Sequence, residues 1–379
     1  MRNLRDKFKL CTDKLAKATI IILILSIGLS IPVFISEVKD SKPDHSKDGW
    51  DVMAPEELNL DSGYLKEADK FIGKTDATSF IIVKDGYIVY EKYYRGQRPK
   101  NFSYCGSLSN SLLSALIGIA ISDGQIKSVE QKIEDFYPEL VNSDFNQEIR
   151  DITIENLLTM TSGFGEVSED FFHKTDWIKS QFNSKLMSHP GETFRYSNSA
   201  TYLLSGIITR TTGMSALEYA KKKILEPMKL NSIIWYTGPE GYNIGGDFLY
   251  LTPSGMAKFA YLFINKGSWK GQQILPESWV RNTLKIHTNF SQEELIRFGD
   301  KRIMGFGYNT IVSQLDSQKT AYIMEYEVGN QYASIIPDTN MVVVVSTYHS
   351  NFKKSFSYSS MMKVLNEYIM PATDCNSLK

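Results

Sequence analysis

Apolar and small residues recur at helical spacing between Gly106 and Gly124, a stretch that reads GSLSNSLLSALIGIAISDG. The spacing predicts a buried helix that starts at Ser107 and stops at Asp123-Gly124. The positions that carry the spacing are Leu108, Leu112, Ala115, Leu116, Ile119 and Ala120. A serine at a helix start lies beside unsatisfied backbone N–H groups, which favour negative charge on its oxygen or on a carbonyl that it attacks. Ser107 is therefore interpreted either as a simple N-cap or as a nucleophile.

Short runs of β-branched and aromatic residues stand at both ends of the remaining chain. Ser79 to Gly96 contains two such runs around Asp85-Gly86, which is a two-residue hairpin signal. After Gly305 the pattern returns to strands, which are predicted at Ala321–Tyr326, Tyr332–Ile336 and Met341–Thr347.

The region between these strands has a helical pattern. Candidate helices, separated by loops that contain glycine and proline, are Ile152–Met160, Ser199–Thr212, Ser215–Leu225, Pro253–Asn265 and Pro276–Leu284, and an amphipathic segment from about Phe356 to Ile369 predicts a closing helix. Strands at both ends with helices between them predict an α/β (α+β) fold, in which one antiparallel sheet is built from both termini and carries an inserted helical lobe. We expect the catalytic surface where sheet and insertion meet.

The amino-terminal segment has a different character. Residues 1–17 are positively biased, and Ala18 to Ser36 contains no charge, which is about the length of a membrane-crossing helix. The flanking charge predicts a cytoplasmic amino end and therefore a domain on the outer side of the membrane. A signal peptide that is cleaved to release a secreted domain is the alternative. Residues 37–58 are polar and predict a linker, residues 59–372 the domain and residues 373–379 a tail.

Composition and charge argue against nucleic-acid binding, a disulfide framework and a metal site. The chain has 379 residues and a net charge of −1, so it has enough residues for a substantial core, and no basic stripe marks a nucleic-acid partner. Three cysteines make no disulfide framework, and Cys105 is interpreted as a small buried residue rather than a thiol nucleophile. The five histidines are scattered without a ligand pair, so neither a metal nor a cofactor is predicted.

A second polar group precedes an apolar helix in the stretch HPGETFRYSNSATYLLSGIITRTTG. Tyr196 and Asn198 are two residues apart there, so a phenol and an amide can point the same way. Such a pair can exchange a proton with a serine hydroxyl and hold a substrate carbonyl. The alternative is a loop tyrosine packed on the helix beside an asparagine turn.

Together these stretches resemble the serine β-lactamase and penicillin-binding protein superfamily, more narrowly its esterase-like and 6-aminohexanoate-dimer-hydrolase-like branch. The likeness covers about residues 75 to 370 and follows ordered landmarks, among them DGYIVYEKYYRG, ITIENLLTMTSGF, PGETFRYSN, LYLTPSGMAKFAYLF and VGNQYASIIPDTNMVVVV. The resemblance implies the sheet-plus-helical-insertion fold and an acyl-enzyme mechanism on an amide, lactam or ester carbonyl.

The resemblance also implies roles for individual residues. Ser107 would be the nucleophile, and Tyr196 and Asn198 would be the tyrosine and asparagine of the Y-x-N motif. One oxyanion-hole donor would be the backbone N–H of Ser107. The other would come from the edge of the last strand, near Gln331 and Tyr332.

The chain departs from the family at two motifs. The S-x-x-K lysine, one helical turn beyond the serine, is replaced by Asn110, which cannot take up a proton near neutral pH. At the Lys-Thr-Gly-like triplet the chain has Glu327-Val328-Gly329, whose glutamate would repel a substrate carboxylate.

Three hypotheses follow from this combination. The protein is a working serine hydrolase that uses Tyr196 as base, or a catalytically weak or inactive binding module at the cell surface for a cell-wall peptide or similar ligand. The third is that Asn110 is an isolated change in an otherwise intact enzyme. In each case the expected partner is a small molecule or peptide with an amide or ester carbonyl, together with the membrane through the amino-terminal helix.

Overall fold

The two ends of the domain meet in the centre of one sheet. The computed structural model describes residues 49–141, 147–165, 169–230, 232–298, 300–324, 331–348 and 355–374. Within them an eight-stranded sheet has the order β1-β3-β2-β13-β12-β11-β10-β9. Its strands are β1 (Asp51–Val52), β2 (Ala77–Lys84), β3 (Tyr87–Tyr93), β9 (Ile303–Phe306), β10 (Ile311–Gln314), β11 (Thr320–Ile323), β12 (Tyr332–Ile336) and β13 (Met341–Thr347). Early β2 therefore pairs antiparallel with late β13, as the sequence predicts.

One pair of strands departs from the predicted antiparallel arrangement. β1 runs parallel to β3, so the sheet is mixed. The hairpin prediction is confirmed, because β2 and β3 are antiparallel and joined through Asp85 and Gly86, with φ of 51° and 87°. Positive φ at both turn residues is the geometry that Asp-Gly favours in a two-residue hairpin.

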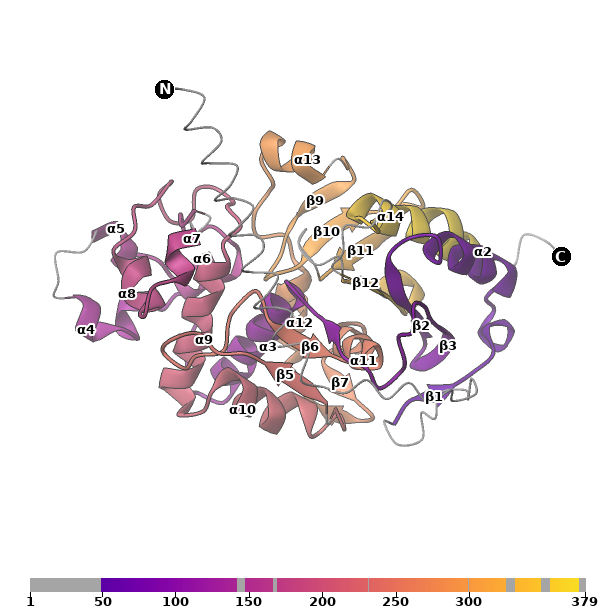
Figure 1. Ribbon diagram of the computed structural model, residues 1–379, viewed down its shortest axis with the longest axis horizontal. Helices are drawn as coiled ribbons and strands as arrows, with labels where there is room; N and C mark the ends of the chain where they lie inside the picture. The colour runs from indigo at the N-terminus through magenta and orange to yellow at the C-terminus, as the bar shows by residue number, and fades with distance from the viewer. Residues whose placement is uncertain are drawn as a thin grey trace, which may run out of the picture. The chain divides into compact units, whose positions relative to one another are not determined.

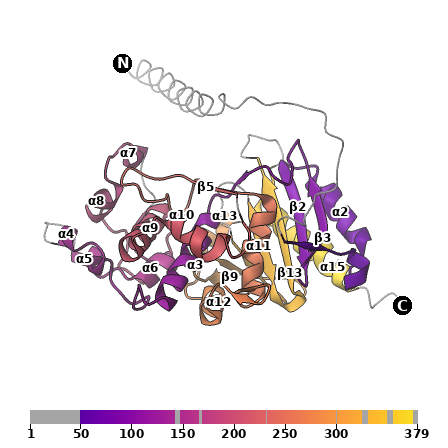
Figure 2. The ribbon, with the colours of Figure 1, turned by 90° about the horizontal axis from the view of Figure 1, so that it is seen from below.

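Alternating side chains of the central strands fill a separate core on each face of the sheet. Ile81 and Val83 of β2 belong to one buried cluster, and Phe80 and Ile82 belong to the other. Helix α11 (Pro253–Ile264) packs on the first face, and α2 (Ser62–Ile72), α14 (Tyr358–Lys363) and α15 (Met370–Thr373) pack on the second (Figures 1 and 2). The predicted closing helix is confirmed as α14, the π-helical segment Val364–Ile369 and α15.

The inserted lobe lies to the side of the sheet (Figure 2). Its helices are α3 (Leu108–Ser122), α4 (Pro138–Val141), α5 (Gln147–Arg150), α6 (Ile154–Leu158), α7 (Glu169–Phe172), α8 (Trp177–Phe182), α9 (Asn198–Thr212), α10 (Ala216–Ala220) with the π-helical segment Lys221–Leu225, and α12 (Glu277–Leu284). Helix α13 (Gln292–Phe298) lies beside β9 instead, and its Leu295 packs against the second core (Figure 1). Each of the five helices predicted between the strands is found within two residues at its start, although some are shorter than predicted.

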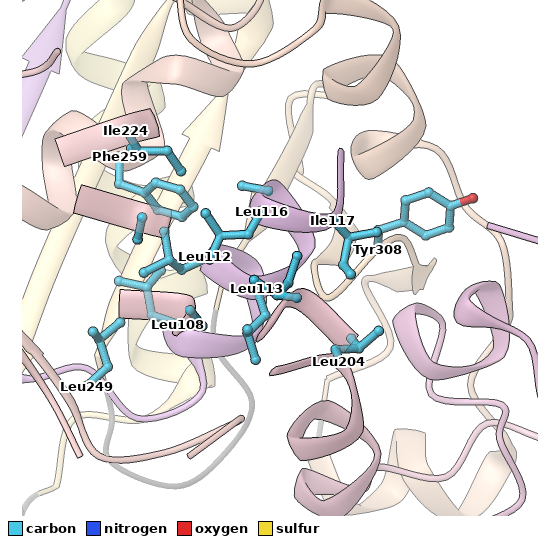
Figure 3. Close-up of a cluster of buried hydrophobic side chains, with 14 of the residues drawn as sticks. Leu108, Leu112, Leu113, Leu116, Ile117, Leu204, Ile224, Leu249, Phe259 and Tyr308 are labelled. Atoms are coloured by element: carbon cyan, nitrogen blue, oxygen red, sulfur yellow. The ribbon is translucent and has the colours of Figure 1, made fainter. Parts of the chain in front are cut away.

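Helix α3 runs through the middle of the lobe and is buried on all sides from Leu108 to Ala120. Its leucines and Ile117 contact side chains from α9, α11 and β6, including Leu204, Phe259 and Leu249 (Figure 3). Gly118 allows α12 to approach, because a Cβ there would lie 2.3 Å from ring atoms of Trp279.

The prediction of a wholly helical insertion is wrong in one respect. Three short strands, β4 (Ser103–Tyr104), β5 (Ile233–Trp235) and β6 (Leu249–Leu251), form a second sheet in the order β4-β6-β5. Strands β7 (Ser268–Trp269) and β8 (Gln272–Gln273) form a separate two-stranded sheet. Strands of two or three residues are too short to show a period of two in the sequence.

Several predictions lie outside the described residues. These are the basic segment 1–17, the apolar segment 18–36, most of the linker, and Glu327-Val328-Gly329. Across the described ranges, no helix combines the length and the apolar character needed to cross a membrane.

Candidate active site

Ser107 occupies the turn that leads from β4 into α3. Cys105 donates its backbone N–H to the carbonyl oxygen of Leu249 in β6 at 2.7 Å, and Gly106 follows with a positive φ of 46°. Only 6% of Ser107 is exposed, and its side chain makes no capping hydrogen bond to α3. Ser107 is thus the N-cap residue of α3 by position, but its hydroxyl does not cap the helix. Cys105 is buried, as predicted for a small core residue, and its Sγ donates a hydrogen bond to the carbonyl oxygen of Ser103.

The hydroxyl of Ser107 faces the phenol of Tyr196. Ser107 Oγ lies 2.7 Å from Tyr196 Oη, and either oxygen can be the donor. The loop that carries Tyr196 is fixed on both sides, because Arg195 donates its backbone N–H to the carbonyl oxygen of Met160 at 2.7 Å and Ser197 caps α9. The structure thus brings together two residues that are 89 positions apart in the sequence.

Asn110 joins the same group from the first turn of α3. Its Nδ2 donates to Tyr196 Oη at 2.9 Å, and the residue is 2% exposed. Because Asn110 donates, the phenol oxygen is the acceptor of that bond and keeps its own proton for Ser107. If Tyr196 is ionised instead, the Ser107 hydroxyl donates to it. Asn110 therefore orients the tyrosine, although it cannot itself accept the proton.

Asn198 is the first residue of α9. The backbone at Gly246 passes close to the side chains of both Asn198 and Asn110. A Cβ added to Gly246 would lie 2.2 Å from Asn198 Oδ1 and 3.0 Å from Asn110 Oδ1. Gly245 approaches α9 equally closely, since its Cβ would lie 2.3 Å from the carbonyl carbon of Thr201. These glycines are not among the residues predicted from the sequence, although a Gly-Gly pair is a signal for a turn or loop.

Gln331 and Tyr332 lie at the start of β12, the strand before the last one in the chain. The side chain of Gln331 is held by the backbone of Thr347, with Nε2 donating at 2.9 Å and Oε1 accepting at 3.1 Å. Tyr332 is buried in the core and packs edge-on against Phe356. Any contact of these two residues with a substrate is therefore expected to come from the backbone. The third predicted residue of this edge, Gly329, lies outside the described residues.

An aromatic cleft opens next to Asn198. Its lining includes Phe171, Phe172, Trp177, Tyr202 and Phe248. Burial and the hydrogen bond to Glu240 raise the pKa of the Tyr202 phenol well above its ordinary value. Tyr202 therefore stays protonated near neutral pH and is not a competing base.

A family model described as Beta-lactamase matches residues 68–358 of the sequence. The chain belongs to the beta-lactamase family. The span of the match contains the three residues that meet around the Tyr196 phenol, and the sheet with its inserted helical lobe is the architecture that the resemblance to this superfamily implied.

Individual members of the beta-lactamase family are distant from this chain. A beta-lactamase of Escherichia coli (strain K12) is 24% identical over 219 residues, which cover 54% of this chain and 56% of that protein. The 6-aminohexanoate-dimer hydrolase of Paenarthrobacter ureafaciens is 18% identical over 241 residues, covering 58% and 60%. The chain thus spans less than two thirds of the length of these curated relatives.

The fold is shared over a greater length. The solved structure of a beta-lactamase/D-alanine carboxypeptidase from Yersinia pestis superposes with a TM-score of 0.65 at 15% identity, covering 84% of this chain and 99% of that one. At this identity the likeness establishes the fold alone.

Proposed function

We propose that the protein is a serine hydrolase that cleaves an amide or ester through an acyl-enzyme on Ser107. The contact of 2.7 Å between Ser107 Oγ and Tyr196 Oη carries the proposal. A nucleophile within hydrogen-bond reach of a group that can take its proton is the arrangement that covalent catalysis requires.

The proton and bond changes follow from this contact. Ionised Tyr196 takes the Ser107 proton while Oγ bonds to the substrate carbonyl carbon, and negative charge collects on the carbonyl oxygen. The backbone N–H of Ser107 at the start of α3 and the start of β12 are the proposed donors to that oxygen. Tyr196 then returns the proton to the departing amine or alcohol, and water releases the acyl group by the reverse sequence.

The residue at position 110 determines how fast we expect the hydrolase reaction to be. A phenol has an ordinary pKa near 10, so a site that uses tyrosine as base needs a neighbouring positive charge to keep it ionised near neutral pH. Asn110 supplies a hydrogen bond at that position but no charge. We therefore infer a slow enzyme. The missing charge also supports a second candidate function, which is a binding module for a cell-wall peptide or similar ligand with little catalysis.

The proposed location follows from the sequence. Residues 18–36 would anchor the protein in the membrane, residues 37–58 would act as a linker, and the hydrolase domain, residues 59–372, would lie outside the cell. Cleavage after the apolar segment would instead release the same domain.

Labelling with a fluorophosphonate or a fluorescent penicillin tests the proposal. We expect wild-type protein to become labelled and Ser107→Ala to remain unlabelled. Ser109→Ala is the matched control, because the Ser109 hydroxyl donates to the carbonyl oxygen of Gly106. Label on folded Ser107→Ala would show that the nucleophile is another residue. Thermal stabilisation by muropeptides without labelling or product formation would favour the binding module.

A further inference from the structure

Phe248 has a backbone conformation that its residue type disfavours. Its φ is 53°, in the left-handed region, and among the described residues it is the one aromatic residue with a positive φ. A bulky side chain is strained there, and such strain is found mainly where function requires it. The position of the Phe248 ring therefore requires an explanation.

The surrounding chain holds Phe248 in this conformation. Its backbone N–H donates to Asp247 Oδ1 at 2.7 Å, and its carbonyl oxygen accepts the N–H of Tyr236 at 3.2 Å. The next residue, Leu249, is paired with Trp235 in the second sheet. The backbone that carries the ring is thus fixed by hydrogen bonds.

Hydrophobic packing accounts poorly for the strain. Phe248 is 40% exposed, and its ring lies edge-on to Tyr236, which is 50% exposed, with 6.4 Å between the ring centroids. The free energy gained by an apolar side chain is roughly proportional to the area removed from water. A ring exposed to this degree therefore gains only part of what a core phenylalanine gains.

The Phe248 ring helps to enclose the aromatic cleft beside Asn198. Trp177 of α8 and Tyr202 of α9 line the same cleft, which encloses a free volume of about 30 Å³. On this measure a water molecule needs about 10–15 Å³, and a cavity of about 150 Å³ accepts benzene. The cleft as it stands therefore has room for about two or three non-hydrogen atoms and not for a ring.

A series of contacts connects this cleft to the proposed nucleophile. Asn198, which lines the cleft, meets the backbone of Gly246, and so does the side chain of Asn110. Asn110 donates to the Tyr196 phenol, which is hydrogen-bonded to Ser107. A substrate carbonyl attacked by Ser107 is therefore expected to lie close enough for one end of the substrate to enter the cleft.

We propose that Phe248 is a specificity-determining residue, which narrows this cleft so that the enzyme accepts amides or esters with a small group on the side of Asn198. The inference rests on the proposed hydrolase function. A group of two or three non-hydrogen atoms fits, whereas a longer alkyl chain or a ring collides with the Phe248 ring. The strained backbone keeps the ring in the position where it excludes such groups.

The rates at which dialkyl fluorophosphates label Ser107 in the full-length protein test the proposal. In this reaction Ser107 Oγ bonds to phosphorus, fluoride leaves and Tyr196 takes the proton, so labelling can be followed even when turnover is slow. Both alkoxy groups of a reagent are identical, so its orientation in the site does not matter. The ratio of the dibutyl rate to the dimethyl rate is compared between proteins, which cancels the intrinsic reactivities of the reagents.

We expect this ratio to rise about tenfold or more in Phe248→Gly and in Phe248→Ala, because a poorly fitting group in an apolar pocket costs about that much. Tyr236→Ala is the matched control, since Tyr236 is exposed and contacts the Phe248 ring but does not line the cleft. It should keep the wild-type ratio. A gain for the bulky reagent cannot result from misfolding.

Melting temperatures test the role of the strained backbone. Phe248→Gly should melt at a higher temperature than Phe248→Ala, because both lack the ring and only glycine is unstrained at this φ. Equal melting temperatures would show that residue 248 is not held in the left-handed conformation, which would overturn the inference.

The labelling outcomes also separate the proposal from the function on which it rests. If Ser107 is labelled but the ratio is the same in wild type and in both folded Phe248 variants, the size limit is wrong and the hydrolase stands. If neither reagent labels Ser107 in any of these proteins, the hydrolase function fails together with the size limit.

Discussion

At the scale of single residues, the chemistry of the site depends on which atoms surround one phenol oxygen. Tyr196 Oη contacts a hydroxyl at 2.7 Å and an amide nitrogen at 2.9 Å. The geometry expected of a nucleophile and its base is therefore present. Asn110 supplies a hydrogen bond to the phenol but no positive charge.

The missing positive charge at residue 110 predicts a gain of function from one substitution. We expect Asn110→Lys to raise the turnover of a nitrophenyl acyl ester by about 10²-fold or more, since loss of a general base or its activating partner typically costs about 10²–10⁴-fold. Steady-state kinetics measure the effect. Asn183→Lys, which adds the same charge at the exposed end of α8, should leave turnover unchanged. An unchanged rate in folded Asn110→Lys would show that the site is impaired for more than one reason.

At the scale of elements, helix α3 positions Ser107 and Asn110 through its packing. Every residue of the helix from Leu108 to Ala120 is buried, so its direction is set by the side chains of neighbouring elements on every side. Its close contact with α12 depends on the missing side chain at Gly118.

Replacing that glycine should separate the two helices. We expect Gly118→Ala to lower the free energy of unfolding by about 1–3 kcal/mol, because the added methyl group overlaps the Trp279 ring and overpacking of a core costs that much. Chemical denaturation measures the loss. In the double variant with Trp279→Leu the alanine should cost less than in the wild-type background, and equal cost in both backgrounds would mean that Trp279 is not the obstacle.

At the scale of the whole molecule, ionised groups connect the ends of helices in the lobe. Asp123 at the end of α3 accepts hydrogen bonds from Lys223 Nζ and Tyr219 Oη, both at 2.7 Å. Burial opposes ionisation, but the hydrogen bonds from Lys223 and Tyr219 outweigh it and lower the pKa of the Asp123 carboxyl.

The lowered pKa predicts a dependence of stability on pH. The carboxylate stabilises the fold above its unfolded pKa of about 3.9, and this contribution is lost as the pH falls through the lower folded pKa. Asp123→Asn should therefore reduce stability at neutral pH and converge with wild type near pH 2. Denaturation at a series of pH values tests this, and parallel curves for the two proteins would contradict it.

The sequence could predict the long elements but not the short ones. The hairpin at Asp85-Gly86, α3, α9, α11 and the strands β12 and β13 follow from periodicity and turn chemistry. The second sheet was missed because its strands have two or three residues and are fixed by pairing between distant segments. The positions of Ser107 and Tyr196 were expected to be close only through the resemblance, and nothing local in the sequence predicted the hydrogen bond from Asn110 to Tyr196.

The pairing of β2 with β13 also sets the order in which the protein can fold during synthesis. Ala77–Lys84 leave the ribosome early, but their partner Met341–Thr347 is among the last segments made. The centre of the sheet therefore cannot close until nearly the whole chain is available, and such long-range pairing makes folding slow. A chain terminated before Met341 would expose the apolar edge of β2, a form that chaperones or proteases would recognise before any substrate could bind.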